Sequence, residues 1–143
     1  MERTNNFIPK GYRTVTPYLT VNGADRAIDF LKKAFDAQEV SRFESPDNKK
    51  VLHAVVKIGD SFIEISDATP EMPPVQNAIH LYVSDVDTVY KKAVKAGGRS
   101  EMEPKDQFYG DRESYIKDPF GNSWYIATHL KDVSEQELRL HHA

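Results

Sequence analysis

Cysteine is absent from the 143 residues of this chain. The absence excludes a disulfide framework, a thiolate metal site and a cysteine nucleophile. A chain without cysteine fits a reducing compartment, and we expect a cytoplasmic protein.

Long apolar runs and an excess of positive charge are also missing. Residues 1–14 are polar and lack the apolar core of a signal peptide. No run approaches the roughly 20 apolar residues of a membrane helix. The net charge is −3, with a pI of about 5.9. We therefore expect neither a membrane nor a nucleic acid as partner.

The chain is rich enough in apolar residues to fold as one globular domain. Hydrophobic residues make up 39% and charged residues 29% of the sequence, which is typical of a packed protein. The length suits a single domain over residues 1–143. No glycine-rich phosphate loop and no nucleophile elbow occurs in it.

The sequence repeats itself with a shift of 62 residues, from Leu19-Thr20-Val21 to Leu81-Tyr82-Val83. The same shift places Gly59-Asp60-Ser61-Phe62 on Gly121-Asn122-Ser123-Trp124. Three prolines within residues 68–74 separate the halves and indicate an extended linker. We predict module one at about 15–67, a linker at 68–76 and module two at about 77–129.

Each half predicts one helix followed by three strands. Apolar residues at helical spacing follow Asn22 in the first half and Ser84 in the second, so we expect these two residues to cap the helices. Gly97-Gly98 is expected to end the second helix. A further short helix is predicted at about 134–142, with Ser134 as its cap.

Strands are indicated by alternating apolar residues and turn signals. The expected strands are 14–21, 39–44, 51–58, 61–67, 99–103, 112–118 and 122–128. Together with the helices they predict an α+β fold of two tandem β-α-β-β-β modules.

Alternation along the strands assigns side chains to two faces of each sheet. The face expected to pack on the helix holds Pro17, Leu19, Val21, Leu52, Ala54, Val56, Ile58, Ile63, Ile65, Ile79, Leu81 and Val83. The opposite face holds Thr16, Tyr18, Thr20, His53, Val55, Glu64, Ala78, His80 and Tyr82. Its His, Tyr and Thr residues favour the lining of a cleft over a fully solvated surface.

Several phrases of the sequence together are specific for one branch of a known family. They are Pro17-Tyr18-Leu19-Thr20-Val21, Ala27-Ile28-Asp29-Phe30, His53-Ala54 with Ile58-Gly59-Asp60-Ser61, His80-Leu81-Tyr82-Val83-Ser84-Asp85-Val86, Asp106-Gln107-Phe108-Tyr109-Gly110-Asp111-Arg112, and Asp118-Pro119-Phe120-Gly121 with Trp124 and Ile126-Ala127-Thr128-His129. These phrases resemble the vicinal-oxygen-chelate (glyoxalase, bleomycin resistance protein and dioxygenase) superfamily, in its PhnB-like branch. The resemblance covers residues 15 to 135. It implies curved mixed sheets around a cavity that binds a small molecule, with or without a divalent metal.

The resemblance also implies where a metal would be held. The family's ligand positions correspond here to Thr16, Glu64, Ala78 and either Tyr125 or Ile126. Only Glu64 is an ordinary metal ligand, whereas a catalytic metal draws on several His, Asp or Glu side chains. We therefore expect no cofactor, although a divalent metal held by His53, Glu64 and His80 stays open.

Eight side chains are candidates for the site. Glu64, flanked by apolar residues, can act as a general base beside a carbonyl or be a solvated carboxylate. The predicted ligand-binding residues are Tyr18, His53, His80, Tyr82, Tyr109, Arg112 and Tyr125. The tyrosines can stack on a ligand or pack internally. Arg112 can bind a carboxylate or phosphate, or pair locally with an acid.

Two functions follow. The first is a non-catalytic protein that binds a small molecule in the inter-sheet cavity. The alternative is a metal-dependent lyase, isomerase or dioxygenase acting on a small oxygenated substrate, with Glu64 as ligand or general base. A homodimer is expected, because sheet faces and edge strands of this kind need cover.

Overall fold

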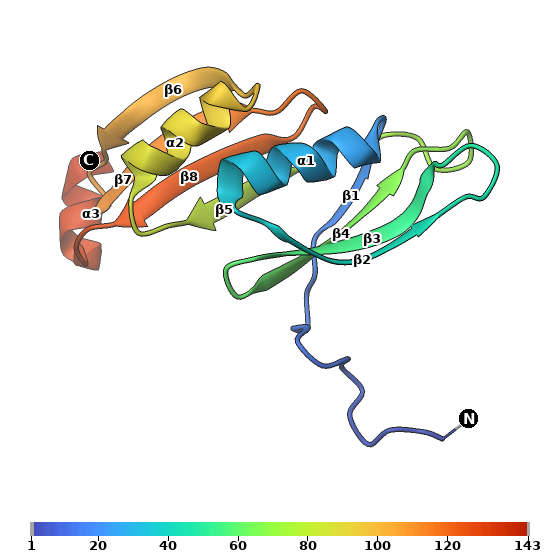
Figure 1. Cartoon of the computed structure of the whole chain (residues 1–143). Coiled ribbons are helices and arrows are strands. Elements are labelled where there is room, and N and C mark those ends of the chain that lie inside the picture. The colour runs from blue at the N-terminus through green and yellow to red at the C-terminus, as the bar shows by residue number, and fades with distance from the viewer. Residues whose placement is uncertain (1, 143) are drawn as a thin grey trace. The chain divides into compact units, whose positions relative to one another are not determined.

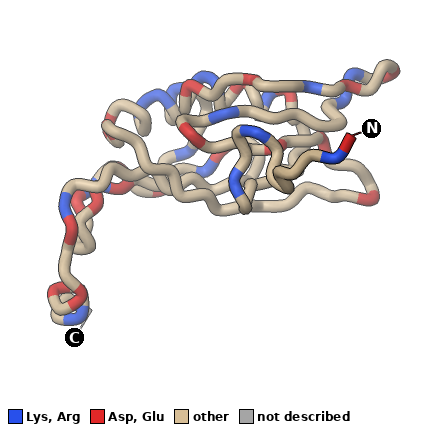
Figure 2. The backbone as a smooth tube through the Cα atoms, turned by 90° about the horizontal axis from the view of Figure 1, so that it is seen from below, with Lys and Arg blue, Asp and Glu red and all other residues tan. Residues whose placement is uncertain are grey.

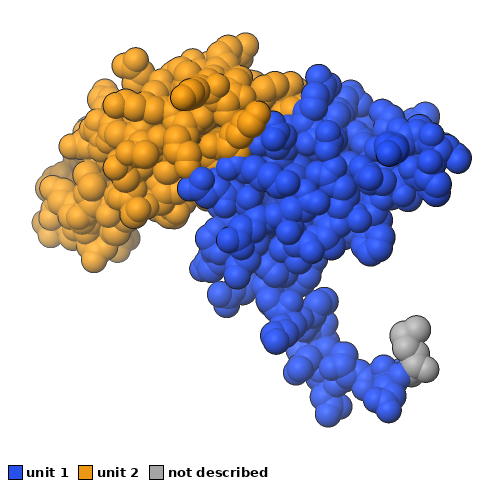
Figure 3. Space-filling model, in the orientation of Figure 1, with its two compact units in different colours: residues 1–32, 36–75 blue, residues 33–35, 76–143 orange. Residues whose placement is uncertain are grey.

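The structure, a computed structural model, describes residues 2–142, except for the side chain of His142. The chain divides into two compact units (Figure 3). Unit 1 runs to Lys32 and continues over Asp36–Val75, and unit 2 holds Lys33–Phe35 and the chain from Gln76 onward. The boundary at residues 75 and 76 falls in the predicted linker.

Unit 1 is a four-stranded sheet with a helix (Figure 1). Its elements are β1 (Tyr18–Val21), α1 (Ala24–Phe35, of which residues 33–35 belong to unit 2), β2 (Gln38–Glu44), β3 (Val51–Ile58) and β4 (Ser61–Asp67). The strand order is β1-β4-β3-β2. The β1–β4 pair is parallel and the other pairs are antiparallel.

Unit 2 repeats this plan. Its elements are β5 (Ala78–Tyr82), α2 (Val86–Lys95), β6 (Arg99–Asp106), β7 (Asp111–Lys117), β8 (Ser123–His129) and α3 (Glu135–His142). The order β5-β8-β7-β6, with a parallel β5–β8 pair, matches that of unit 1. The predicted α+β fold and the duplicated module are therefore confirmed.

Strand pairing fixes how the two units correspond. In unit 1 Tyr18 of β1 pairs with Glu64 of β4, and in unit 2 His80 of β5 pairs with Tyr125 of β8. Since Tyr18 and His80 correspond by the 62-residue shift, Glu64 corresponds to Tyr125 and not to Ile126. The two alternatives for the fourth family position are thus resolved in favour of Tyr125.

One face of each sheet is apolar and buried. In unit 1 the buried set is Leu19, Val21, Ala54, Val56, Ile63 and Ile65, with Ala27, Ile28 and Leu31 of α1. In unit 2 the set is Ile116, Trp124 and Ile126, with Val86 and Ala93 of α2. Burial of these side chains supplies the main drive for folding each module. The opposite faces carry His53, Glu64, His80 and Tyr82, as predicted.

The prediction that Pro17 and Leu52 face the helix is wrong. Leu52 is 59% exposed, because a register irregularity opposite residues 43 and 44 of β2 inserts an extra residue into β3 at this point. A bulge of this kind reverses the alternation, so Val51 turns inward in its place. Pro17 is exposed because β1 begins only at Tyr18, which also shortens the strand predicted over 14–21.

Both predicted helix caps of the modules are also wrong. Gly23, and not Asn22, is the N-cap of α1, and the N–H groups of Gly23 and Ala24 donate to Asp67 Oδ1 at 3.0 and 2.9 Å. Asp85, and not Ser84, caps α2 by accepting from Thr88 N–H. The third cap is confirmed, since Ser134 Oγ accepts from Glu137 N–H at 3.1 Å.

Charged residues of both signs are interspersed along the chain (Figure 2). No helix within residues 2–142 is both long and apolar enough to cross a bilayer.

Candidate functional site

His53 and Glu64 form a pair on the open face of unit 1. They lie on neighbouring antiparallel strands, β3 and β4, and His53 Nε2 lies 2.8 Å from Glu64 Oε1. Because a carboxylate only accepts, the imidazole donates from Nε2. The side chains are 35% and 27% exposed, so the pair is reachable by a ligand. The ring of Tyr18 lies 6.1 Å from that of His53.

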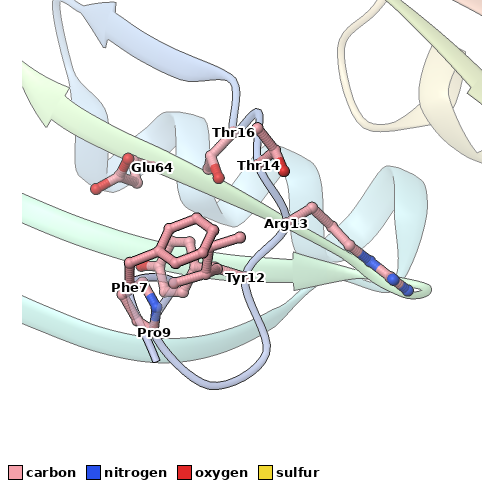
Figure 4. Close-up of a pocket in the computed structure, with 8 residues that line it drawn as sticks. Phe7, Pro9, Tyr12, Arg13, Thr14, Thr16 and Glu64 are labelled. Carbon is pink, nitrogen blue, oxygen red and sulfur yellow. The ribbon is translucent and has the colours of Figure 1, made fainter. Parts of the chain in front are cut away.

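Glu64 lines a pocket of about 660 Å³. Its other lining residues come from the segment before β1: Phe7, Ile8, Pro9, Tyr12, Arg13, Thr14 and Thr16. Figure 4 shows Phe7, Pro9 and Tyr12 grouped on one side, with Arg13 extending away from Glu64. Burial, and then the negative charge of Glu64, raises the pKa of Tyr12. The pocket is large enough for a small organic molecule.

His80 and Glu113 form a second pair, on the open face of unit 2. His80 Nε2 of β5 lies 2.7 Å from Glu113 Oε1 of β7, and Tyr109 Oη donates to the other oxygen of Glu113. Burial, and then this hydrogen bond to Glu113, raises the pKa of Tyr109. With Nε2 donating, His80 Nδ1 is left as an acceptor, and the 40% exposed ring can take a proton from a ligand.

Asp111 repeats this pattern beside Glu113. Tyr82 Oη donates to Asp111 Oδ2 at 2.9 Å, and His129 Nδ1 lies 2.7 Å from Oδ1. The hydrogen bond to Asp111 raises the pKa of Tyr82, and Asp111 followed by Asp132 raises that of His129. Each of two buried carboxylates therefore has one tyrosine and one histidine as partners, which satisfies its need for donors.

Aromatic rings continue along the same face. The rings of Tyr115 and Tyr125 stack at 4.5 Å, and His80 lies 6.3 Å from Tyr125 and 4.6 Å from Tyr82. Burial raises the pKa of Tyr125. These flat surfaces suit a planar or apolar ligand.

Arg112 lies on the other face of β7, the face that packs on α2. Its Nε and Nη2 donate to Asp87 at 2.9 and 3.0 Å, and Nη1 donates to Asp106 at 3.0 Å. This bidentate pair lowers the pKa of Asp87. The structure thus supports local pairing of Arg112 over ligand recognition.

The residues present do not fit the metal site of the metal-dependent relatives. Of the positions Thr16, Glu64, Ala78 and Tyr125, only Glu64 offers an ordinary ligand. Of the three residues of the alternative set, His53 and Glu64 bond to each other in unit 1, while His80 bonds to Glu113 in unit 2. Within the described residues no three His, Asp or Glu side chains are arranged to hold a metal ion.

Sequence reasoning did not identify Asp111, Glu113 and Tyr115, nor the pocket wall before β1. The signal that could have found them is the alternation along β7, which places Asp111, Glu113 and Tyr115 on one face of the strand and Ser114 and Ile116, both buried, on the other. The apolar residues within 7–12 recur at neither strand nor helix spacing, so the sequence pattern did not predict that this segment lies beside Glu64.

Comparisons with known proteins agree on the fold. A protein of Mycobacterium bovis is 35% identical over 138 residues, covering 87% of this chain and 89% of the relative. A Pseudomonas aeruginosa protein, PA1353, has a structure matching with a TM-score of 0.68 at 20% identity, over 83% of this chain and 99% of the other.

Two further structures are similar. TioX from Micromonospora sp. ML1 matches with a TM-score of 0.64 at 21% identity, over 81% of this chain and 99% of that one. The PhnB protein from Bacillus cereus, described as a putative 3-demethylubiquinone-9 3-methyltransferase, matches with 0.63 at 20% identity, over 81% and 99%. The family model of the Glyoxalase/Bleomycin resistance protein/Dioxygenase superfamily matches residues 13–126. The chain belongs to this superfamily.

Proposed function

We propose that the chain binds a small organic molecule on the sheet faces opposite the helices, without a metal ion. The observation that carries this proposal is the pocket of about 660 Å³ lined by Glu64, which is hydrogen-bonded to His53. A polar group at the base and aromatic walls form the usual composition of a ligand site. The second open face, with His80, Tyr82 and Tyr125, supplies similar chemistry.

Thermal shift against a library of metabolites and drugs tests the proposal. A ligand at about 100 times its Kd stabilises the folded state by about 2.7 kcal/mol, which raises the melting temperature measurably. We expect hits whose shift is lost in Glu64→Gln or His80→Ala and kept in Glu103→Gln, an exposed carboxylate of β6. A library without any hit on the folded protein would refute ligand binding.

Proton transfer is the second candidate function, favoured by His80 held between Glu113 and a ligand-accessible surface. A carboxylate that orients a histidine is the common arrangement of a general base. Glu64 can serve in the same way in unit 1. This candidate differs from the expected metal-dependent lyase, isomerase or dioxygenase in that it is a lyase or isomerase that needs no metal.

An assay for chemical conversion of the compounds that bind distinguishes the two candidate functions, binding alone and catalysis by proton transfer. Catalysis predicts conversion of a bound compound that persists in a chelator and falls about 100-fold or more in His80→Ala or Glu64→Gln. Binding without conversion supports the first candidate. Conversion that requires an added divalent metal would contradict both metal-free forms.

A further inference from the structure

The segment before β1 is held against the sheet of unit 1 by Phe62. The ring of Tyr12 meets that of Phe62 edge to face at 4.7 Å. Gly11 lies beneath them with φ +87°, and a Cβ there would lie 2.7 Å from Phe62 Cζ. A hydrogen bond from Tyr12 N–H to Pro9 O at 3.0 Å closes a turn. Only glycine allows both this conformation and this close approach.

This segment adds a wall that lies partly outside the family match. The superfamily model begins at residue 13, whereas Phe7, Ile8, Pro9 and Tyr12 line the pocket. The Phe7 ring is 93% exposed at the pocket. An apolar ring left so open gains by covering a ligand.

Glu64 is the acidic group that lines the pocket, and the other charged lining residue, Arg13, extends away from it (Figure 4). Glu64 Oε1 accepts from His53, and Oε2 has no partner among the described residues. With a neutral histidine the pair carries one negative charge, and an ammonium group can donate to the free oxygen. The charge of Glu64 acts on Tyr12 across the pocket, so it also acts on a ligand between them.

We infer that Phe7, Pro9 and Tyr12 complete a binding site for a small organic amine, whose ammonium group binds Glu64 and whose apolar body lies against these three side chains. This inference rests on the proposed ligand-binding function and names its ligand class. Phe7, Ile8, Pro9 and Tyr12 lie outside the residues that the superfamily model matches, so the specificity that they give to this pocket is particular to this chain.

Three probes of similar size test the ligand class: benzylammonium, benzyl alcohol and benzoate. Each is titrated into the ¹⁵N-labelled full chain and followed by NMR. Benzylammonium is expected to shift the amide signals of residues 7, 8, 10–16 and 62–64 saturably, with a Kd at least about tenfold below those of the other two. Equal or tighter binding of benzoate would overturn the amine class.

Matched variants test the wall. Gly11→Ala drives a Cβ into Phe62, whereas Gly59→Ala introduces a similar strain, at φ +57°, with nothing within 4 Å. Phe7→Ala removes a lining ring, and Val15→Ala trims an exposed neighbour, 82% exposed, that does not line the pocket. We expect Gly11→Ala and Phe7→Ala to weaken benzylammonium binding about fivefold or more, and the two controls to stay within about twofold.

The outcomes separate this inference from the proposed function. Phe7→Ala keeps the test valid if Gly11→Ala does not fold, since the Phe7 ring is almost fully exposed. If library compounds bind the wild type but benzylammonium does not, the inference is overturned and the proposed function stands. The same holds if library compounds bind and Gly11→Ala and Phe7→Ala both bind benzylammonium as tightly as the wild type does. Absence of binding by every probe and library compound would overturn both.

Discussion

His129 is the residue whose protonation the structure ties most directly to folding. Its two ring nitrogens lie 2.7 Å from Asp111 and 2.7 Å from Asp132, and these carboxylates raise its pKa. The folded state therefore favours the protonated form. Its contribution to stability is fully present below the unfolded pKa of about 6.5 and is lost as the pH rises through the higher folded pKa.

The variant His129→Gln should accordingly lose more stability at low pH than at high pH. Urea denaturation followed by circular dichroism, at about pH 5.5 and about pH 8.5, measures the difference from wild type. We expect the gap between the two proteins to narrow as the pH rises. A gap of the same size at both pH values would show that the charge of His129 does not matter.

Single residues of the site were predictable where the strand pattern was strong. Alternation along residues 51–58 and 61–67 placed His53 and Glu64 on one face, and they are hydrogen-bonded there. Asp111 was missed because it lies just before the strand predicted over 112–118, and Glu113 was missed because no face was assigned to the residues of that strand. Strand ends are the least certain part of any such pattern.

At the scale of the element, Asp67 ties the start of α1 to the sheet. Its carboxylate accepts from the N–H groups of Gly23 and Ala24, and from Val51 N–H at 2.7 Å. No local sequence pattern contains this cap, because Asp67 lies 44 residues from Gly23. Capping signals assume a neighbouring side chain, which is why Asn22 was chosen instead.

Removing that carboxylate should destabilise the fold. Asp67→Ala leaves three backbone donors without their partner, and we expect a loss of about 1–3 kcal/mol in the free energy of unfolding. Asp60→Ala, at the exposed β3–β4 turn, is the control and should stay within about 0.5 kcal/mol. Chemical denaturation measures the free energy of unfolding of both variants. Equal losses in the two variants would contradict the role of Asp67 as a cap.

The bulge in β3 allows a second comparison at this scale. Leu52 is 59% exposed, whereas Leu19 of β1 is 1% exposed. Leu19→Ala should cost about 2–5 kcal/mol, and Leu52→Ala within about 0.5 kcal/mol. A large loss on truncating Leu52 in the isolated chain would contradict the register of β2 on β3.

For the whole molecule, a homodimer remains the predicted state. Apolar side chains of β2 and β3 are exposed, among them Val40, Phe43 and Leu52, and a second copy of the chain that covered them would gain by burying apolar surface. Light scattering of the eluting protein should give about twice the 16.3 kDa of the chain. A mass equal to that of one chain at micromolar concentration would rule the dimer out.

The duplicated architecture was predictable because the repeat, the helix stripes and the strand alternation all agree. The wall of the Glu64 pocket was not, because residues 7–12 have no regular period and their place depends on Gly11 fitting under Phe62. A contact between distant residues of this kind is decided by packing and not by local pattern.

Trp124 is the only tryptophan in the chain. It is fully buried in unit 2, where its Nε1 donates to Asp118 and its ring contacts Phe35. Intrinsic tryptophan fluorescence therefore observes unit 2, to which Phe35 also belongs, while unit 1, which carries Glu64, holds no tryptophan. Trp124 is therefore a natural fluorescent probe of unit 2, and the substitution Phe62→Trp would introduce a corresponding probe into unit 1.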